Sequence, residues 1–599
     1  MTDDRSPYLL WTPEGAPRSG RFDDVYFSRQ DGLAETRAVF LDGCGLPDAW
    51  AGRGDFTVGE LGFGTGLNIA ALLELWRREG PADGRLHLFS IEAFPLSRDE
   101  AARALAAWPQ IAPEAQALLD VWPQATPGFH RLDLPAYRAT LDLAVGDAAW
   151  ALAQWDGRAD AWFLDGFAPS TNPGMWSDAV MDGLQTRSAP GARLATFTVA
   201  GAVRRGLAQR GFAVDKRPGH GRKRERLEAR APGAAAPPPT PGLTAVIGAG
   251  IAGASLARAL TRLGRPVVVI EAEAPGAGGS GFAAGLVTPR LDIGDGAIAA
   301  LYAQALRRAG DLYATVPEAV TARGVLQLPG MARDAARFPK AAAQDIWATE
   351  ALKVLDAPAA SRRLDEPVDE DGLWMAPALA VRPRLIVDAW LRDVPVLTGR
   401  IARIEGEAGA WRLLDADGAL VTPAAQVIIA AGWGAAALEP MLNLRPVRGQ
   451  AEWVEGVHPP VAAAWGGYVV PTGDGLLFGA THDRDDTDTD VRATSREQNK
   501  ARLNMRLPGL AQRVEGLEIH SRAAVRATTP DRLPLVGERA PGLHVLTGLG
   551  SRGLCLAPLL AEHLAARIAG APSPLPHELA MRIDVARPTK PTAPPGASM

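Results

Sequence analysis

Two glycine-rich loops, each following a short apolar run, constrain the fold of this chain more than any other feature. Residues 56–68 read FTVGELGFGTGLN and residues 243–254 read LTAVIGAGIAGA. Each apolar run predicts a buried strand, and the residues after each set of glycines have helical spacing. A strand, a glycine turn and a helix together bind a nucleotide at the helix N-terminus. We therefore predict two nucleotide-binding domains of α/β class in succession.

A stretch of alanine and proline separates the two loops. Residues 231–242 read APGAAAPPPTPG, which has no apolar periodicity with which to pack a core and favours extended backbone. We predict a first domain over residues 1–230, a linker over 231–242 and a second domain over 243–586. The final stretch, RPTKPTAPPGASM at 587–599, is predicted to be disordered.

The composition excludes several classes of protein. The 599 residues are 47% hydrophobic and contain no apolar run of the ~20 residues that a bilayer span requires. Cys44 and Cys555 are the only cysteines, which excludes a disulfide scaffold and fits a reducing cytoplasm. The nine histidines show no metal-binding spacing, so we predict no metal ion.

The charge distribution allows two interpretations. A net charge of −5 argues mildly against a nucleic-acid partner. Residues 215–230, however, read DKRPGHGRKRERLEAR, a basic cluster that includes Arg222, Lys223 and Arg224. This segment is either a solvated helix end before the linker or a contact for phosphate groups.

The second loop has the pattern of a dinucleotide site. Gly248, Gly250 and Gly253 have GxGxxG spacing, and the next apolar run, PVVVIE, ends in Glu271. The glycines allow the tight turn and the approach of a pyrophosphate, and the acid binds ribose hydroxyls.

Three later segments extend this site. They are APGAGGSGFAAGLVTP (274–289), VIIAAGWGA (427–435) and LHVLTGLGSRGLCLAPLLAEHLAARI (543–568). The cofactor-binding residues predicted in them are Gly281, Gly432, Gly548, Gly550, Ser551, Gly553 and Leu554. Together with the first loop, these motifs resemble the D-amino-acid oxidase and glycine oxidase family of flavoproteins over residues 244–575. The resemblance implies an FAD-binding Rossmann domain with an inserted antiparallel sheet on the substrate side.

The same resemblance suggests residues for the substrate. Arg526, just before the TPD element at 529–531, matches the position whose guanidinium holds the substrate carboxylate, and Arg552 is a second possibility. Either arginine could instead form a structural salt bridge. Tyr468, in GGYVVPTGDGLLFGATHD (466–483), either lines the site or lies in the core.

The first loop has a different spacing. Gly62, Gly64 and Gly66 form GxGxG, without the third glycine of a dinucleotide turn. The loop resembles that of Rossmann-like methyltransferases, which bind S-adenosylmethionine. Glu60 in the first strand, Glu92 at the end of the next and Asp147 after LAVG are the further residues that this resemblance assigns to the cofactor.

Asp165 is the residue most suited to the methyl-transfer chemistry. It directly follows the predicted strand DAWFL and is the first residue of the polar loop DGFAPSTNPGMW. A carboxylate there can accept a proton from the acceptor amine and orient it; alternatively it only caps the following loop. Tyr26 and Phe27 are candidates for the acceptor pocket.

The combination of the two domains resembles the bifunctional enzymes that complete 5-methylaminomethyl-2-thiouridine at the wobble position of tRNA. The motifs on which this resemblance rests are ELGFGTGLN, DAWFLDGFAPSTNPGMW, TFTVAGAVRRGL and GHGRKRE in the first half, and VIGAGIAGA, VRATTPDRLPLVG and GLGSRGL in the second. The resemblance implies that the flavin domain oxidises the carboxymethylamine, releasing glyoxylate. The first domain then methylates the exposed amine. On this interpretation, the enzyme acts on tRNA as a cytoplasmic monomer and the basic cluster contacts phosphate.

One departure leaves alternatives open. Where the family carries an asparagine and then a glutamine, this chain has Phe282 and Ala283–Ala284. Flavin binding is expected to survive, whereas oxidase activity on the tRNA-linked substrate could be reduced. Two rival hypotheses are an amino-acid oxidase fused to an unrelated amine methyltransferase, and a tRNA-binding protein without catalysis.

Overall fold

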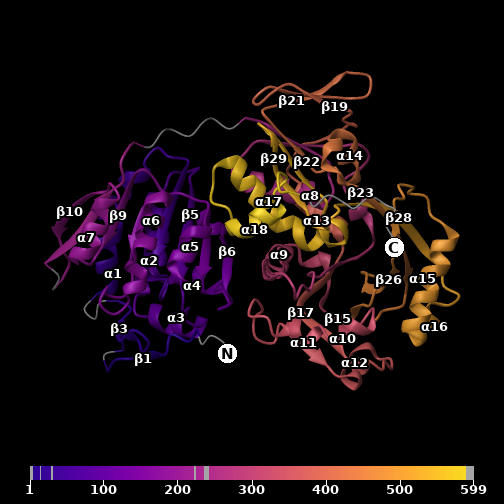
Figure 1. Ribbon diagram of the computed structural model, residues 1–599, viewed down its shortest axis with the longest axis horizontal. Coiled ribbons are helices and arrows are strands. Elements are labelled where there is room, and N and C mark those ends of the chain that lie inside the picture. The colour runs from indigo at the N-terminus through magenta and orange to yellow at the C-terminus, as the bar shows by residue number, and fades with distance from the viewer. Residues whose placement is uncertain (1–4, 14, 28–30, 222–223, 235–241, 589–599) are drawn as a thin grey trace, which may run out of the picture. The chain divides into compact units, whose positions relative to one another are not determined.

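The computed structural model describes residues 5–13, 15–27, 31–221, 224–234 and 242–588. Its internal contacts divide the chain into two units (Figure 1). The first consists of Met1–Pro239 and Ala571–His577, and the second of Thr240–Gly570 and Glu578–Met599. In the described residues, no helix is long and apolar enough to cross a membrane.

The first unit is built on an eight-stranded sheet with the order β10-β11-β9-β8-β4-β5-β7-β6. Its strands are β4 (Asp55–Leu61), β5 (Arg85–Glu92), β6 (Gly128–Leu134), β7 (Ala139–Val145), β8 (Ala159–Leu164), β9 (Ser188–Thr196), β10 (Ala213–Pro218) and β11 (Glu225–Arg230). The run from β9 through β8, β4 and β5 to β7 is parallel, so the carboxyl ends of these strands meet at one edge. A small sheet of β1 (Leu9–Trp11), β2 (Pro17–Ser19) and β3 (Asp24–Val25) precedes it.

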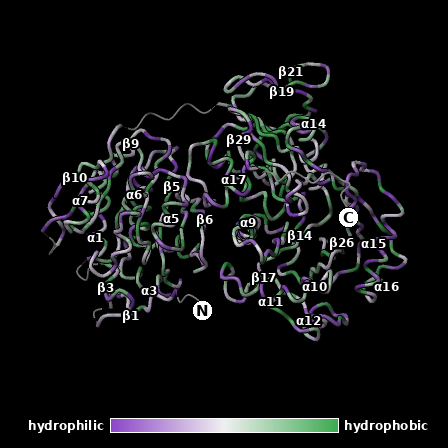
Figure 2. The backbone as a smooth tube through the Cα atoms, viewed as in Figure 1, coloured by the Kyte–Doolittle hydropathy of each residue, from purple (hydrophilic) through white to green (hydrophobic). Residues whose placement is uncertain are grey.

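Helices cover both faces of this sheet. They are α1 (Gly32–Thr36), α2 (Leu67–Glu79), α3 (Arg98–Leu105), α4 (Ala112–Asp120), α5 (Ala148–Gln154), α6 (Asp178–Arg187) and α7 (Gly201–Gln209). One apolar cluster packs Phe56 and Val58 of β4 against α2 and α4, and another packs Leu61 and Trp162 against α5, α6 and α7. Figure 2 shows the hydrophobic stretches concentrated inside each unit. Burial on both faces explains the near-continuous apolar character of these strands.

The basic segment 215–230 forms the hairpin of β10 and β11, and the expectation of a helix end is wrong. In β11, Leu227 and Ala229 are buried and the charged residues between them point outward. This alternation has the two-residue period of a strand.

The second unit contains a six-stranded sheet with the order β18-β13-β12-β22-β30-β29. Its strands are β12 (Thr244–Ile247), β13 (Val267–Glu271), β18 (Val396–Thr398), β22 (Gln426–Ile429), β29 (Leu535–Ala540) and β30 (Leu543–Thr547). They run parallel except for β29. The principal helices beside them are α8 (Ile251–Arg262), α9 (Gly296–Tyr313), α13 (Pro383–Leu391) and α17 (Gly553–Ala569).

A largely antiparallel ten-stranded sheet is inserted into this arrangement. It comprises β14 (Gly285–Val287), β15 (Val320–Gln327), β16 (Leu352–Leu355), β17 (Gly372–Val381), β23 (Arg445–Glu455), β24 (Ala462–Ala464), β25 (Tyr468–Pro471), β26 (Gly475–Gly479), β27 (Asp483–Arg484) and β28 (His520–Thr528). The smaller elements are β19 (Arg403–Glu405), β20 (Trp411–Leu414), β21 (Leu420–Ala424), α10 (Ala332–Ala335), α11 (Phe338–Ala342), α12 (Ala357–Leu364), α14 (Ala435–Leu438), α15 (Ala493–Arg506), α16 (Pro508–Val514) and α18 (His577–Ile583). The predicted α/β class with an inserted antiparallel sheet is confirmed.

The ends of the predicted domains show ordered contacts. Ala231 donates its N–H to the Ala192 carbonyl at 2.8 Å, so the first unit extends beyond residue 230. The guanidinium of Arg587 lies 3.0 Å from Asp531, and its side chain is 7% exposed. The remainder of the predicted linker, 235–241, and of the predicted tail, 589–599, lies outside the described residues.

The segment Ala571–His577 follows α17 of the second unit but belongs to the first by its contacts. Arg131 of β6, whose side chain is 9% exposed, donates to the Pro572 carbonyl at 2.8 Å. The same guanidinium pairs with Asp142 at 2.7 Å. The returning segment is therefore anchored to a buried ion pair.

A buried ion pair joins three helices of the second unit. Glu562 of α17 accepts from Arg308 of α9 at 2.7 Å and from Arg258 of α8 at 3.2 Å. The side chains of Glu562 and Arg308 are 8% and 4% exposed. Removing one partner of such a pair leaves a charge without compensation in a region of low dielectric constant.

We predict that Glu562→Ala destabilises the second unit by about 3 kcal/mol or more, because Arg308 then stays buried without its carboxylate. Denaturant unfolding of the full chain, followed by a probe in the second unit, measures the effect. The matched control is Glu405→Ala, whose exposed pair with Arg403 is 3.8 Å long, and it should cost no more than about 1 kcal/mol. Equal losses in the two variants would contradict the prediction.

Candidate cofactor and substrate sites

The first glycine loop connects β4 to α2 and brings the backbone of two strands together. Gly62, Gly64 and Gly66 have φ values of 88°, 52° and 78°, a left-handed conformation that side chains other than glycine rarely adopt. A Cβ at Gly62 would lie 2.3 Å from the carbonyl oxygen of Asp165, just after β8. Glycine is thus required by the close approach of the two strand ends.

Asn68, in the first turn of α2, joins the acids of this site. Its amide donates to Asp165 at 2.7 Å and to Glu60 at 3.1 Å, and it accepts from the Thr36 hydroxyl at 2.8 Å. The second oxygen of Glu60 accepts from Ser90 at 2.5 Å. The predicted residues Glu60 and Asp165 are therefore linked through an asparagine that the sequence analysis missed, although it directly follows the loop in GFGTGLN.

Burial determines the charge of this network. Glu60 is 1% exposed, and burial, with a contribution from the charge of Asp165, raises its pKa to about 8. At neutral pH the Glu60 carboxyl thus mostly retains its proton, which avoids a buried charge next to that of Asp165. Asp165 remains beside it as the acceptor of the Asn68 hydrogen bond.

The other predicted cofactor acids occupy the neighbouring strand ends. Glu92, at the end of β5, accepts from the Gly64 N–H at 3.0 Å and from the Phe94 N–H at 2.8 Å. Burial raises its pKa. Asp147 follows β7, is exposed, and caps α5 by accepting from Ala149 at 2.9 Å and Trp150 at 3.2 Å. Glu60, Glu92 and Asp165 thus border the loop, whereas Asp147 caps α5, the helix after β7.

Tyr26 and Phe27 lie in different surroundings. The Tyr26 ring is 3.2 Å from a Cβ built on Gly64 and 5.2 Å from the ring of Phe167, so it lies against the loop. Burial raises the pKa of Tyr26, so its hydroxyl stays neutral. Phe27 packs edge-on against Trp108, with ring centroids 4.6 Å apart.

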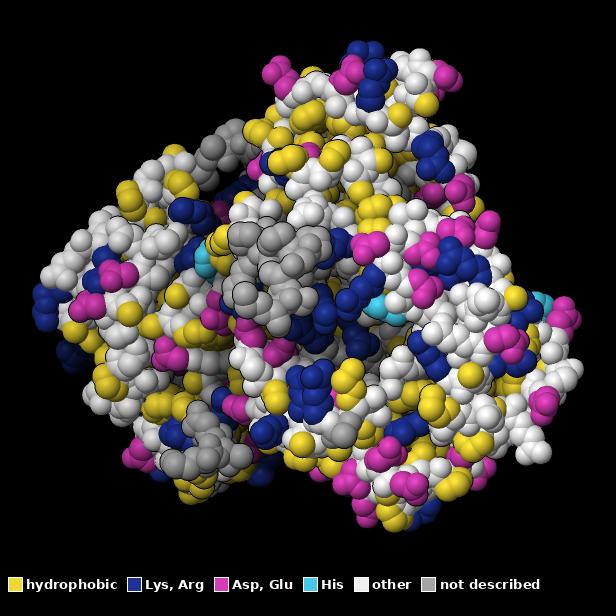
Figure 3. Space-filling view, turned by 45° about the vertical axis from the view of Figure 1, so that its right-hand side comes forward, with side chains coloured by type: hydrophobic (Ala, Val, Ile, Leu, Met, Phe, Trp, Pro, Cys, Tyr) yellow, Lys and Arg dark blue, Asp and Glu magenta, His cyan; other side chains and the backbone are white. Residues whose placement is uncertain are grey.

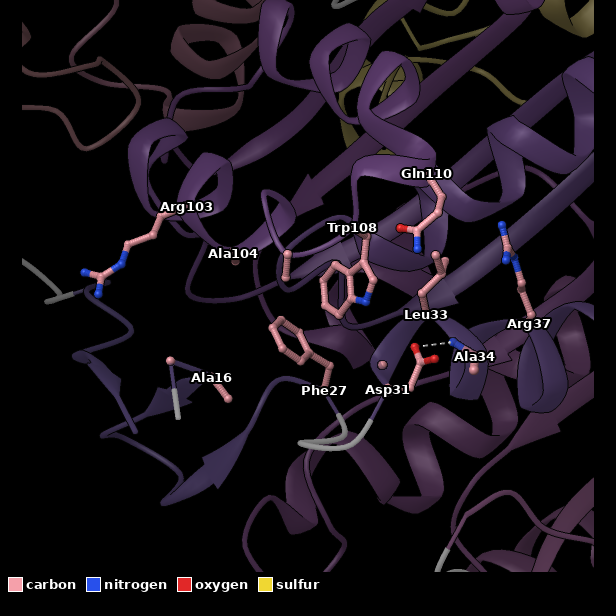
Figure 4. A pocket seen from close by; sticks show the side chains of 13 residues that line it. Ala16, Phe27, Asp31, Leu33, Ala34, Arg37, Arg103, Ala104, Trp108 and Gln110 are labelled. Atoms are coloured by element: carbon pink, nitrogen blue, oxygen red, sulfur yellow. Dashed lines mark hydrogen bonds between the residues drawn. The ribbon is translucent and has the colours of Figure 1, made fainter. Parts of the chain in front are cut away.

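Phe27 and Trp108 line a cavity of about 380 Å³ in the first unit (Figure 4). The cavity is also lined by Arg37, Arg103 and Gln110.

The predicted substrate residues Arg222 and Lys223 lie outside the described residues, and Arg224, the next residue in the sequence, is exposed.

The second glycine loop has the close contacts of a dinucleotide turn. A Cβ at Gly253 would lie 1.8 Å from the Gly248 carbonyl oxygen, and one at Gly248 would lie 2.7 Å from the Ala430 carbonyl oxygen. At Gly250, in contrast, a Cβ would meet only the Ser280 hydroxyl, at 3.4 Å. The loop is tight inside and open at its middle glycine, which fits a pyrophosphate approaching the backbone.

Two side chains hold this loop in shape. Glu271, at the end of β13, accepts from the Ala249 N–H at 2.7 Å. Ser280 accepts from the Ile251 N–H at 2.9 Å. Glu271 thus lies at the position that a ribose-binding acid requires.

The later glycine segments lie around the same loop. A Cβ at Gly553, the first residue of α17, would lie 3.8 Å from Ile251 of α8, so the N-termini of these helices adjoin. Leu554 contacts Gly285 of β14, and Gly432 accepts from the Thr547 hydroxyl at 3.2 Å. Gly548 and Gly550 have φ values of 71° and 54°.

The last two predicted cofactor residues differ in exposure. Gly281 is closely packed, since a Cβ there would lie 2.5 Å from the Gly276 carbonyl oxygen. Ser551, in contrast, is exposed. The structure therefore gathers the predicted glycines of four separate segments around α8 and α17, in an arrangement that fits FAD.

Arg526 of β28 lies across Gly449 of the neighbouring strand β23. A Cβ at Gly449 would be 2.3 Å from Nη1 of Arg526, so a larger residue there would displace the guanidinium from this position. Nη1 is buried and has no hydrogen-bond partner among the described residues. An unpaired guanidinium N–H is costly when buried, and a substrate carboxylate would satisfy it.

Tyr468 and Arg552 have separate surroundings. Burial raises the pKa of Tyr468, while the charge and hydrogen bond of Arg526 oppose that rise, so the hydroxyl adjoins Arg526. Arg552 donates to the Thr288 hydroxyl, and burial lowers its pKa. The structure brings Tyr468 and Arg526 together, whereas at least one N–H of Arg552 donates to Thr288.

Phe282, Ala283 and Ala284, which stand where the resembling family has polar residues, make apolar contacts. Ala284 is 3% exposed and belongs to an apolar cluster against which Phe282, Ala283 and Tyr468 pack. The oxidase site is thus apolar on this side and cationic at Arg526. Among the described residues, no group of three or more His, Cys, Asp or Glu side chains is arranged to hold a metal ion.

Comparison with known proteins agrees with this division. Residues 244–567 match the family described as FAD dependent oxidoreductase, and residues 109–232 match the S-adenosyl-L-methionine-dependent methyltransferase family. A protein of Caulobacter sp. (strain K31), named tRNA 5-methylaminomethyl-2-thiouridine biosynthesis bifunctional protein MnmC, is 55% identical over 98% of both chains. A protein of Maricaulis maris with the same name is 44% identical over 94% of this chain and 92% of its own.

A solved structure supports the fold of the second unit. Glycine oxidase from Geobacillus kaustophilus superposes with a TM-score of 0.52 and 20% sequence identity. The match covers 59% of this chain and all of the oxidase. At this identity the likeness concerns the fold alone.

Glu60 gives a pH-dependent prediction. Its carboxyl titrates near 4.5 when unfolded and at about 8 when folded. The folded state therefore binds the extra proton between these values. The free energy of unfolding of the first unit should fall as the pH rises from about 5 to about 8, by up to about 1.4 kcal/mol per pH unit. Glu60→Gln, which has no proton to lose, should remove this dependence.

Urea unfolding of the full chain at a series of pH values, with a probe in the first unit, measures the slope. Glu79→Gln, at an exposed carboxylate paired with Arg78, serves as the control and should keep the wild-type slope. An unchanged slope in Glu60→Gln would show that Glu60 is ionised in the folded protein.

Proposed function

The chain belongs to the MnmC family of bifunctional proteins of tRNA 5-methylaminomethyl-2-thiouridine biosynthesis, and from this we propose that it carries out two successive reactions on the wobble uridine of tRNA. The second unit removes the carboxymethyl group from 5-carboxymethylaminomethyl-2-thiouridine. The first unit then methylates the exposed aminomethyl group. The observation that carries the first reaction is the buried, unpartnered Nη1 of Arg526 beside Tyr468.

Arg526 is proposed to hold the carboxylate of the substrate. A guanidinium binds a carboxylate through two parallel hydrogen bonds, which fixes both the position and the orientation of the group. Tyr468, neutral because burial raises its pKa, can donate a further hydrogen bond. The loop at Gly248–Gly253 and the start of α17 would hold FAD, which would supply the oxidant for the methylene carbon between the carboxylate and the amine. Water then hydrolyses the resulting imine to the aminomethyl group and glyoxylate. The apolar side chains around Phe282 exclude water from the oxidation step.

Asp165 is proposed to receive the proton of the acceptor amine. Its carboxylate is held by Asn68 at 2.7 Å, next to the loop that would bind S-adenosylmethionine. Because Glu60 retains its proton at neutral pH, Asp165 is the site's available base on that side. S-adenosylmethionine would supply the methyl group. The Tyr26 and Phe167 rings next to the loop offer a surface on which the modified base can stack.

We propose that the protein acts as a monomer, with FAD and S-adenosylmethionine as its cofactors. We also propose a cytoplasmic location, where tRNA is modified. An amino-acid oxidase fused to an unrelated methyltransferase is less well supported, because the match to the relatives covers both units and the segment between them.

Nucleoside analysis of tRNA from a deletion strain tests the function directly. The carboxymethylaminomethyl nucleoside should accumulate, and the full-length gene should restore the methylaminomethyl form. An unchanged nucleoside profile in the deletion strain would refute the proposed function. Accumulation of the aminomethyl form instead would restrict the chain to the methylation step.

For the oxidase site, we predict that Arg526→Gln lowers kcat/KM for removal of the carboxymethyl group by about 100-fold or more, because a charge-assisted carboxylate contact worth about 3 kcal/mol is lost. The bound flavin and the methylation of aminomethyl tRNA should be retained. Arg392→Gln, which changes another arginine of the second unit, is the control. Normal removal by Arg526→Gln with full flavin would exclude Arg526 as the carboxylate ligand.

For the methyl site, we predict that Asp165→Asn lowers the rate of methylation by about 100-fold or more, since the amide cannot accept the amine proton. The asparagine oxygen can still accept from Asn68, so binding of S-adenosylmethionine should change little. The aminomethyl nucleoside should then accumulate in tRNA. A rate that recovers as the pH rises and deprotonates the amine would identify the proton-accepting role, whereas a loss that is independent of pH would contradict it.

A further inference from the structure

The basic segment of the first unit is largely neutralised by its own acids. Within the described residues of the β10–β11 hairpin, Lys216 pairs with Glu225 at 2.7 Å and Arg226 with Glu228 at 2.6 Å. Arg217 lies 3.3 Å from Asp215 and 3.7 Å from Glu228. These cations have carboxylate partners, so this part of the cluster offers little free positive charge to a phosphate.

The second unit presents a different set of arginines next to Arg526. Arg445, Arg484 and Arg532, which we call the arginine rim, are all exposed. Strand register places Arg484 and Arg526 opposite Val447, on either side of β23. Arg445 is two residues along β23 from Val447, about 7 Å away and on the same face of the sheet. Arg532 follows in the turn after β28.

The arginine rim lacks acidic partners. In the part of the chain that the structure describes, none of its three guanidinium groups lies within 4.0 Å of a carboxylate or makes a side-chain hydrogen bond. Two nearby acids are engaged elsewhere, since Asp483 pairs with the buried Arg448 at 3.2 Å and Asp531 with Arg587 at 3.0 Å. Asp485 is the remaining acid beside Arg484 in sequence.

His482 reports the positive field of this surface. Burial lowers its pKa, and the charges of Arg526, Arg484 and Arg532 lower it further, against a smaller opposing effect of Asp483. His482 thus lies in the electrostatic field of three neighbouring arginines. Figure 3 shows Lys and Arg side chains gathered beside a histidine on the face turned toward the viewer.

We propose that the arginine rim binds the phosphate backbone of the tRNA strand whose modified uridine enters the oxidase site. The inference rests on the proposed function and adds where the second unit holds the RNA. Arg526 alone suffices for the single carboxylate of the substrate. Three further exposed arginines, one on β23, one on β27 and one in the turn after β28, instead match an extended polyanion. Each guanidinium can bind a phosphate through paired hydrogen bonds.

The test compares two triple variants of the full chain with equal changes of net charge. The rim variant carries Arg445→Gln, Arg484→Gln and Arg532→Gln. The control carries Arg400→Gln, Arg403→Gln and Arg539→Gln, at exposed arginines 3.5–3.8 Å from carboxylates. Affinity for unmodified tRNA transcript is measured over a range of salt concentrations, and kcat/KM is measured for both reactions. Bound flavin is determined from its absorbance.

We expect the rim variant to bind tRNA about tenfold or more weakly near 0.15 M salt. The slope of log affinity against log salt should fall by about 2, because each lost phosphate contact removes about 0.7–0.9. Removal of the carboxymethyl group should decline more than methylation, with normal flavin content. The control variant should resemble the wild type.

An unchanged affinity and salt slope in the rim variant would overturn the inference, as would an equal loss in the control, which would indicate an effect of net charge alone. If the rim variant loses flavin, the single variants Arg484→Gln and Arg532→Gln repeat the test at smaller amplitude and are judged by the same criteria. A wild-type chain that neither binds nor modifies tRNA would refute the proposed function itself, which distinguishes that failure from failure of the inference.

Discussion

We propose that the N-termini of three helices carry the binding chemistry of this protein, because the first turn of a helix leaves backbone N–H groups without partners inside the helix. The residues before α2, α8 and α17 are Gly66, Gly250 and Arg552, and none of them makes a side-chain capping hydrogen bond. In α5, by contrast, Asp147 caps the first turn. The helices α2, α8 and α17 each follow a parallel strand, so their N-termini face the edge where α/β sheets bind ligands.

The two sites have opposite electrostatic character. Glu60, Glu92 and Asp165 surround the loop of the first unit, whereas Arg526 and the arginine rim dominate the second. The difference matches the proposed substrates, since the oxidase site must attract a carboxylate and the methyl site an amine. Removal of the carboxymethyl group takes away the negative charge that Arg526 is proposed to bind. The product is thus a poor ligand for the site that made it and a suitable one for the acidic site.

The sequence predicted the elements well where local chemistry decides the structure. Glycine spacing, apolar strands and acids at strand ends are local patterns, and they located both loops, Glu92, Glu271 and Asp165. The segment 215–230 was misread because its charges obscured the alternation of Leu227 and Ala229. The closeness of the Arg526 side chain to Gly449 depends on the register of β23 and β28, which no local pattern reveals. Asn68 was missed because its partners Thr36, Glu60 and Asp165 come together only in the folded unit.

The segment Ala571–His577 gives the chain an unexpected topology. The polypeptide passes from the first unit to the second through residues 235–241, and it returns to the first unit after α17 before ending in the second. The two halves are therefore interlaced and do not simply follow each other. A methyltransferase excised at the linker would lack the Pro572 carbonyl to which Arg131 donates. A single cut at the linker would therefore leave part of the first unit covalently attached to the second.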